Sequence, residues 1–334
     1  MEIDKKLYYN PNLLYSYNRL LNFVISERGL GKTYGFKKRV INNYLRNGEQ
    51  FIYLRRYRTE FKKLPMFFKD IDANNEFPNH KLEVKGKQLL IDGKTAGYAI
   101  ALSTWLQEKS NSYPNVTTVI FDEFLVEKSL VRYLPGEVDA FLNMLDTIIR
   151  NRDNVKAFLL ANSVTIANPY FVYFNLQPNV HKRFNAYENI VIEIPQSRDF
   201  MREREKTKFG SLIKNTEYGN FALGNEFVND SPDFIDKRSK DSIFSFGIQY
   251  HDAVIGVWIS YAMGLIYCST KLDPDGQMYA LTTKDHRPNL LLLSNYKQNP
   301  YLNQVSKAFQ KGYLRFDNQY IKNTMYDIFR HMSL

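Results

Sequence analysis

The segment 26–33 has the residue types and spacing of a loop that binds the phosphates of a nucleotide. Its residues are Ser26, Glu27, Arg28, Gly29, Leu30, Gly31, Lys32 and Thr33. In a Walker A loop, G-x-x-x-x-G-K-[ST], backbone N–H groups wrap the phosphates, the lysine reaches the β- and γ-phosphates, and the last hydroxyl binds Mg²⁺. Gly31, Lys32 and Thr33 fit this pattern, while Ser26 replaces its first glycine. We therefore predict that the segment binds ATP, with Thr33 as a ligand of Mg²⁺.

Two adjacent carboxylates, Asp122 and Glu123, follow the apolar run 119–121. Acids at the end of a buried strand need compensation, and a metal ion supplies it. We expect Asp122 to hold Mg²⁺ and Glu123 to polarise the water that attacks the γ-phosphate. Such a pair is typical of P-loop enzymes that hydrolyse ATP, whereas simple nucleotide kinases usually lack the second acid.

Three further residues could act on the γ-phosphate. Asn162 ends the apolar run 158–161 and could sense the phosphate, or it could merely cap the following turn. An amphipathic stretch predicts a helix over 137–150, which Arg150 ends and Arg152 follows. Either arginine could reach the γ-phosphate of a neighbouring subunit, or both could face the dipole of their own helix.

The candidate residues fall at junctions between predicted strands and helices. Up to residue 197, apolar runs predict strands at 20–25, 50–56, 82–84, 88–91, 117–121, 155–161 and 189–194, and helices at 32–46 and 137–150. This alternation predicts an α/β fold with a parallel sheet covered by helices. A second G-K-T, at 93–95, follows an acid and precedes no helical pattern, so we expect a turn there.

The chain changes character after residue 197. The highly charged stretch 198–226 predicts a helical linker. From residue 227 on, the runs 244–250, 254–260 and 265–269 predict an antiparallel meander, and 278–282 a further strand. Two helical patterns flank Gly312, so 227–334 should form a small α+β domain.

Composition bounds the possible partners. The chain has 334 residues, a net charge of +10 and one cysteine, which excludes an internal disulfide. The positive charge suits a polyanion, although it could also serve solubility. No apolar run approaches the roughly 18 residues of a membrane span, so we expect no membrane partner.

The sequence resembles the DNA-packaging ATPases of the small protein-primed podophages, the Picovirinae type. The stretches that carry the resemblance are 7–11 (LYYNP), 28–32 (RGLGK), 48–53 (GEQFIY), 108–111 (EKSN), 121–124 (FDEF), 150–152 (RNR), 237–241 (KRSKD) and 312–319 (GYLRFDNQ). They run nearly from end to end, and several are not general features of ATPases.

The resemblance implies an organisation and a set of partners. It implies a P-loop ATPase of the additional-strand catalytic Glu class over 1–197 and a degenerate ribonuclease H-like domain over 227–334. It further implies a homo-pentameric ring that packages double-stranded DNA through the capsid portal protein, together with a structural packaging RNA in some members. The ring would work in the host cytoplasm, docked on the procapsid, and be absent from the mature virion.

The resemblance also assigns roles to individual residues. It implies that Arg150 is an arginine finger acting in trans and that Lys109 acts beside it. For DNA contacts we expect the basic residues at the end of the second strand and in the linker. These are Arg55, Arg56, Arg58, Arg202, Arg204, Lys206 and Lys208.

Two other functions stay open on the sequence alone. A helicase-like ring ATPase would use the same phosphate loop and acid pair, and strand separation would distinguish it. A portal adaptor with a relic nucleotide site would not be expected to keep Lys32, Thr33, Asp122 and Glu123 together.

Overall fold

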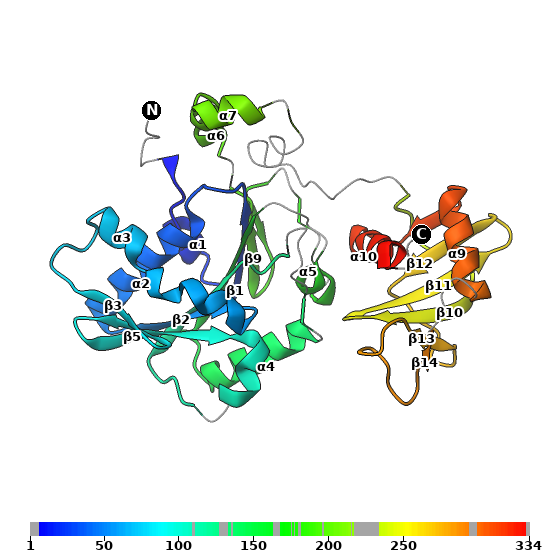
Figure 1. Ribbon diagram of the computed structural model, residues 1–334, viewed down its shortest axis with the longest axis horizontal. Coiled ribbons are helices and arrows are strands. Elements are labelled where there is room, and N and C mark those ends of the chain that lie inside the picture. The colour runs from blue at the N-terminus through cyan, green and yellow to red at the C-terminus, as the bar shows by residue number, and fades with distance from the viewer. Residues whose placement is uncertain are drawn as a thin grey trace. The chain divides into compact units, whose positions relative to one another are not determined.

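The computed structural model describes two compact units of the chain (Figure 1). One comprises residues 1–133, 137–164 and 177–228, and the other 134–136, 165–176 and 229–334. The described residues are 7–108, 111–126, 133–134, 136–162, 168–174, 176, 178–179, 182–195, 197–214, 216, 234–293 and 299–331. None of the helices in these ranges has the length and apolar character that crossing a membrane requires. The domain boundaries expected at 197 and 226 stay a prediction.

The first unit is built on a nine-stranded sheet with the order β3-β4-β5-β2-β6-β7-β1-β9-β8. Its strands are β1 (Leu21–Ser26), β2 (Gln50–Arg55), β3 (Leu82–Lys85), β4 (Gln88–Ile91), β5 (Lys94–Ala101), β6 (Val116–Asp122), β7 (Lys156–Asn162), β8 (Phe184–Ala186) and β9 (Ile190–Glu193). The strands from β5 to β9 in this order are parallel, and β3, β4 and β8 are antiparallel edges. The predicted α/β fold with a parallel sheet is confirmed.

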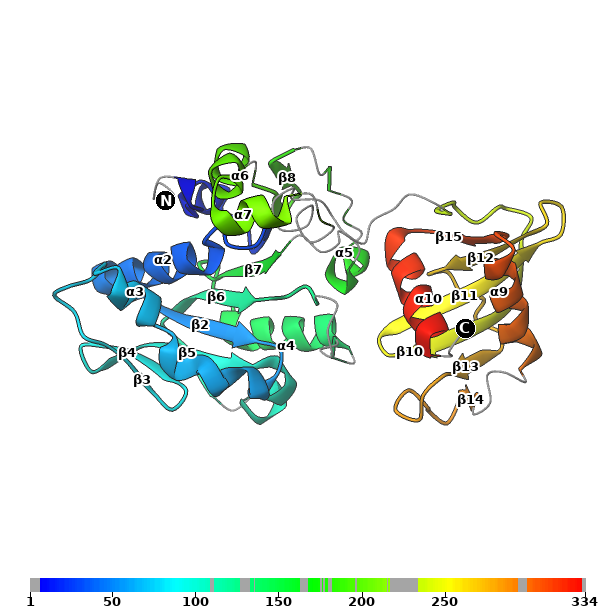
Figure 2. The same cartoon turned by 45° about the horizontal axis from the view of Figure 1, so that its top comes forward.

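Helices cover both faces of this sheet (Figure 2). Ile120 of β6 packs in the core shared with Phe36 of α2 (Lys32–Asn47), whereas Phe121 stacks on Phe141 of α4 (Glu137–Ile149) with ring centroids 5.8 Å apart. Since successive side chains of a strand point to opposite faces, α2 and α4 lie on opposite sides. The remaining helical segments of this unit are α1 (Asn12–Ser16), η2 (Arg58–Met66), α3 (Lys69–Ala73), η3 (Leu102–Glu108), α6 (Arg198–Glu205) and α7 (Lys208–Ile213).

The strand order explains how distant segments meet. Strand β7 lies between β1, which leads into 26–33, and β6, which ends in Asp122. This is the additional strand that the resemblance implied. Because the carboxyl ends of parallel strands share one edge of a sheet, the phosphate loop, the acid pair and Asn162 lie at the same edge.

Strand β5 is the main element that the sequence analysis missed. The turn expected at 93–95 is present at Gly93, with φ +73°, but Lys94 already begins an eight-residue strand that pairs with β2. Half of the residues of this strand are alanine or glycine, among them Gly97. Phe51 of the neighbouring strand lies 2.8 Å from the place of a Cβ at Gly97, so the sheet leaves no room for a side chain.

The charged stretch after residue 197 is helical, as predicted, but forms two helices that belong to the first unit. Phe200 of α6 is only 2% exposed and contacts the ring of Tyr8 edge to face. The Thr207 side chain accepts a hydrogen bond from Gly210 N at the start of α7, which separates the two helices. Residues 215 and 217–226 of the predicted linker lie outside the described residues.

The second unit is a six-stranded sheet with the order β14-β13-β10-β11-β12-β15. Its elements are α5 (Pro169–Tyr173), β10 (Ile243–Tyr250), β11 (Ala253–Ser260), β12 (Leu265–Ser269), β13 (Met278–Ala280), β14 (Leu291–Leu292), α9 (Pro300–Gln310), β15 (Leu314–Phe316) and α10 (Gln319–His331). The predicted antiparallel meander β10-β11-β12 is confirmed, and β13 and β14 continue parallel to β10. Residues of α9 and α10 pack in the core of this unit.

Candidate active site

The backbone of 26–33 forms the loop that the pattern predicts. Gly29 and Gly31 adopt φ values of +89° and +86°, which glycine tolerates far better than other residues. Ser26 is not among the residues with positive φ, so the missing first glycine costs no backbone strain. Gly31 caps α2 without a side-chain hydrogen bond, as suits a helix N-terminus whose N–H groups face phosphate oxygens.

Lys32 lies at the centre of this loop. Its Nζ donates hydrogen bonds to Ser26 Oγ at 2.9 Å and to the carbonyl oxygens of Ser26 and Glu27 at 3.3 and 3.2 Å. It also donates to Asn162 Oδ1, at 3.2 Å, from the end of β7. The structure therefore places Asn162 beside the lysine that would face the γ-phosphate.

Thr33 and Asp122 form the candidate Mg²⁺ site. Thr33 Oγ1 donates to Asp122 Oδ1 at 3.0 Å, and the Tyr53 hydroxyl donates to Asp122 Oδ2 at 2.9 Å. Burial, and then the Asp122 carboxylate, hold the pKa of Tyr53 well above its ordinary value, so this hydroxyl keeps its proton. Hydroxyl and carboxylate oxygens are hard ligands, and this donor set fits Mg²⁺.

Glu123 is held by Arg55. Its side chain is 62% exposed, its backbone is left-handed with φ +60°, and its Oε2 lies 2.6 Å from Arg55 NH2. Arg55 also pairs with Glu60 at 2.6 Å and with Asp122 at 3.4 Å. Release from Arg55 would free Glu123 to orient a water molecule.

The sequence analysis assigned Arg55 and Arg56 to DNA, and the structure corrects this. Arg56 is only 2% exposed and pairs with Glu137, which is 1% exposed, at 2.7 Å. The Arg55 side chain is 13% exposed and forms ion pairs with three carboxylates. Periodicity alone could not show these pairings, because all the acids except Glu60 lie more than 60 residues away in the sequence.

The first residues of the loop contact helix α6. Ser197 Oγ donates to the Glu27 carboxylate, and Arg204 NH1 donates to the Arg28 carbonyl oxygen. Burial raises the pKa of Glu27, whose side chain is turned toward Ser197. Sequence reasoning did not foresee these contacts, since nothing in the charged stretch 198–208 indicates which residues meet the loop.

Arg150 and Arg152 have different surroundings. The guanidinium of Arg152 donates to five carbonyl oxygens, those of Tyr113, Pro114, Val116, Ile148 and Ile149. Arg150 is exposed, and its NH1 lies 3.4 Å from Ser112 Oγ. Arg152 therefore connects the end of α4 to the start of β6 through its hydrogen bonds. Arg150, which is exposed, is the arginine that a partner subunit could contact.

We expect Arg152→Ala to destabilise the fold by about 1 kcal/mol or more, because partly buried carbonyl groups at the end of α4 and the start of β6 lose their donor. The measurement is thermal or urea unfolding. Arg150→Ala is the matched control and should leave the unfolding midpoint near that of the wild type. An unchanged midpoint for Arg152→Ala would contradict this structural role.

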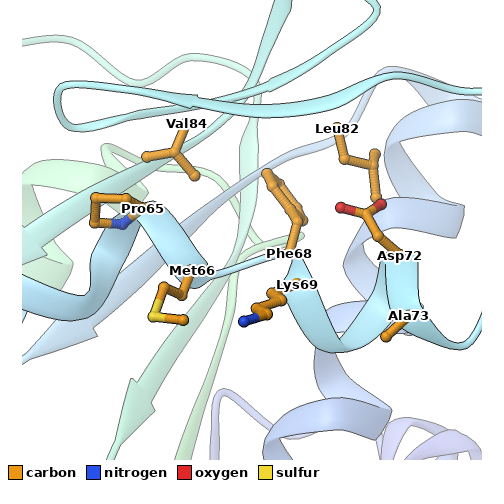
Figure 3. A pocket seen from close by; sticks show the side chains of 8 residues that line it. All are labelled: Pro65, Met66, Phe68, Lys69, Asp72, Ala73, Leu82 and Val84. Carbon is orange, nitrogen blue, oxygen red and sulfur yellow. The ribbon is translucent and has the colours of Figure 1, made fainter.

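Two further features lie outside this group of residues. Lys109 lies outside the described residues. A pocket of about 530 Å³ on the η2–α3 segment is lined by Phe68, Leu82, Val84 and neighbouring side chains (Figure 3). It contains none of the residues predicted to act on ATP, so it is separate from the candidate active site.

Comparison with known proteins gives consistent results. The family model described as "Podovirus DNA encapsidation protein (Gp16)" matches residues 3–334. The DNA packaging protein of Bacillus phage phi29 is 52% identical over 333 residues, 99% of this chain and all of that protein. In the solved structure of the phi29 genome packaging motor, a chain 52% identical superposes with a TM-score of 0.72, covering 98% of this chain and 99% of that one.

A second solved structure covers the first part of the chain. The N-terminal domain of the phi29 DNA packaging ATPase is 54% identical, with a TM-score of 0.55, over 58% of this chain and 99% of that domain.

Proposed function

The chain belongs to the podovirus DNA encapsidation family, and from this premise we propose that it is an ATP-driven translocase that packages double-stranded viral DNA into a preformed capsid. The observation that carries the proposal is the grouping of Lys32, Thr33, Asp122 and Asn162 within hydrogen-bond contact at one edge of the sheet. A relic nucleotide site would have no physical reason to keep this constellation.

We assign each residue of the site a role in hydrolysis. The loop 26–33 and Lys32 bind the phosphates of ATP, and Thr33 and Asp122 hold Mg²⁺. Bound Mg²⁺ would neutralise charge on the β- and γ-phosphate oxygens. Glu123 orients and polarises the attacking water, and Asn162 senses the γ-phosphate from beside Lys32.

Arg150 acts on a neighbouring subunit. Its guanidinium lies beside Ser112, before the start of β6, whereas Glu123 follows the end of that strand. Seven residues of strand span about 20 Å, which is longer than an arginine side chain. Arg150 therefore cannot serve its own site, and a ring of subunits would bring it to the next one.

The remaining proposals concern organisation and place. We propose an ATPase domain over 1–197, a helical linker over 198–226 and a degenerate ribonuclease H-like domain over 227–334. In support of lost nuclease activity, β10 and β13 carry no acidic residue, and no group of three metal-ligating side chains occurs among the described residues. We propose a homo-pentamer with Lys109 acting beside Arg150.

The ring would dock on the portal protein of an empty procapsid in the host cytoplasm and leave before the virion matures. A structural packaging RNA would be an added partner. The test is ATP hydrolysis with and without double-stranded DNA and procapsids. The proposal predicts that both together raise the rate, whereas unwinding of a duplex would favour the helicase alternative.

Exposed basic residues are the remaining candidates for DNA contact. Arg58 and Lys208 are exposed, while Arg202 and Lys206 pair with acids one helical turn away and Arg204 donates to the phosphate loop. A translocase must accept any sequence, so its contacts should be to phosphates.

We expect Arg58→Ala to weaken binding to duplexes of every sequence alike and to reduce the slope of log affinity against log salt by about 1. Titrations of two unrelated duplexes at several salt concentrations measure both quantities. Lys85→Ala, an exposed lysine in the β3–β4 hairpin, is the control. An effect confined to one duplex sequence would contradict phosphate contact.

A further inference from the structure

We propose that Arg56 is a positioning residue for hydrolysis, which fixes the backbone of Glu123 and joins it, through Glu137, to the helix that presents Arg150. The proposal rests on the proposed function, because it assigns a role in the same ATPase site. Arg56 is a buried arginine that binds the backbone beside the acid pair.

The contacts of Arg56 converge from two elements. Its Nε and NH2 donate to the two carboxylate oxygens of Glu137 at 2.7 and 3.0 Å. Its NH1 donates to the carbonyl oxygen of Glu123 at 3.1 Å, and NH2 to that of Phe124 at 2.5 Å. The planar guanidinium fork suits such a two-sided arrangement, which a lysine cannot reproduce.

The backbone at Glu123 needs this support. A residue other than glycine with φ +60° occupies a strained region that persists only where its surroundings impose it. The carbonyl groups that Arg56 binds belong to this residue and the next. The conformation of this turn sets the direction in which the Glu123 side chain leaves the backbone, so a loosened turn would misplace the carboxylate that acts on the water.

Helix α4 is fastened to β6 at both ends. Glu137, its first residue, is held by Arg56 beside the acid pair, and its last residues are held by Arg152 at the start of β6. Glu123 and Arg150 therefore lie at opposite ends of one rigid β6–α4 element. A change at the catalytic carboxylate would be transmitted to the arginine offered to the neighbour.

The first test compares turnover with nucleotide binding. Arg56→Lys keeps the charge but loses the fork, and Glu137→Gln keeps the shape but loses the charge. Each should lower kcat about 10- to 100-fold, as expected when a reacting group is displaced by around 1 Å, while ATP affinity stays within about threefold. The control is Arg183→Lys, the same exchange at an arginine paired with the buried Glu193 at 2.9 Å.

Unfolding midpoints of all variants are measured beside the kinetics. A kcat of either variant within twofold of the wild type, or a loss of ATP affinity as large as the loss of kcat, overturns the proposal. If Arg56→Lys does not fold, Glu137→Gln alone decides. Failure of the wild type to hydrolyse ATP would instead refute the proposed function, so the two failures are distinguishable.

The second test isolates the link to Arg150. Arg56→Lys is introduced into the wild type and into Arg150→Ala, and the factor by which kcat falls is compared. A smaller factor in the Arg150→Ala background is expected, because the part transmitted through α4 has no arginine left to act on. An equal fall in kcat in both backgrounds would mean that Arg56 acts only on Glu123, and would overturn the coupling along α4.

Discussion

Replacing Glu123 by glutamine should lower ATP hydrolysis about 10²- to 10⁴-fold, the usual contribution of a positioned general base. An amide of the same shape cannot accept a proton from the attacking water. Nucleotide binding should change little, because Glu123 is exposed and is held by Arg55 rather than by the phosphate loop. Single-turnover hydrolysis and a fluorescence titration with a labelled nucleotide measure the two effects separately.

Lys32→Ala provides the contrasting variant. It removes the ammonium group at the centre of the loop, so nucleotide binding itself should be lost. A Glu123→Gln protein that hydrolyses ATP at nearly the wild-type rate would refute the assignment of Glu123. The same rate with Lys32→Ala would refute the site as a whole.

Replacing Arg150 by alanine should lower turnover in the assembled ring by about 10³- to 10⁵-fold, the contribution of an arginine finger in characterised NTPases. Nucleotide affinity should change much less, because Arg150 lies far from its own site. For the same reason an isolated monomer should bind ATP but hydrolyse it slowly. The measurement is ATPase activity of the monomer and of the ring assembled on procapsids.

Mixing variants distinguishes action in trans from action in cis. Arg150→Ala subunits keep Glu123, and Glu123→Gln subunits keep Arg150. In a mixed ring one kind of interface joins an intact Glu123 to an intact Arg150, so part of the activity should return. If both variants assemble but mixing restores no ATPase activity, there are two explanations. Either Arg150 does not act in trans, or every subunit must hydrolyse ATP in strict order.

Arg152→Ala separates the two arginines that the sequence analysis could not rank by chemistry alone. Because Arg152 holds five carbonyl oxygens, its loss should lower stability. Selective loss of stimulated turnover, with stability and binding unchanged, would make Arg152 the finger instead.

The parts of the fold that the sequence predicted are those with a strong local signal. Central parallel strands are buried on both faces and read as apolar runs, as in β1 and β6. Strand β5 escaped notice because it begins with Lys94 and Thr95 and is filled with alanine and glycine. The three-residue β15 is shorter than any pattern that periodicity can reveal.

The candidate site divides in the same way. Lys32, Thr33 and Asp122 belong to sequence motifs, and the fold brings them together as expected. Arg56 and Glu137 belong to no motif, since their roles arise from the order of strands in the sheet. The sequence held no signal for this pair, because the burial of Glu137, which makes a cation necessary, is visible only in the structure.

The most direct test of the central claim is the amount of double-stranded DNA that becomes protected from added nuclease when the protein, empty procapsids and ATP are combined. The account predicts protection that grows with the ATP hydrolysed by the wild type, and none with Glu123→Gln, even though that variant still binds nucleotide. Protection of DNA by the Glu123→Gln protein, or hydrolysis by the wild type without any protection, would contradict the conclusion that ATP hydrolysis drives DNA into the capsid.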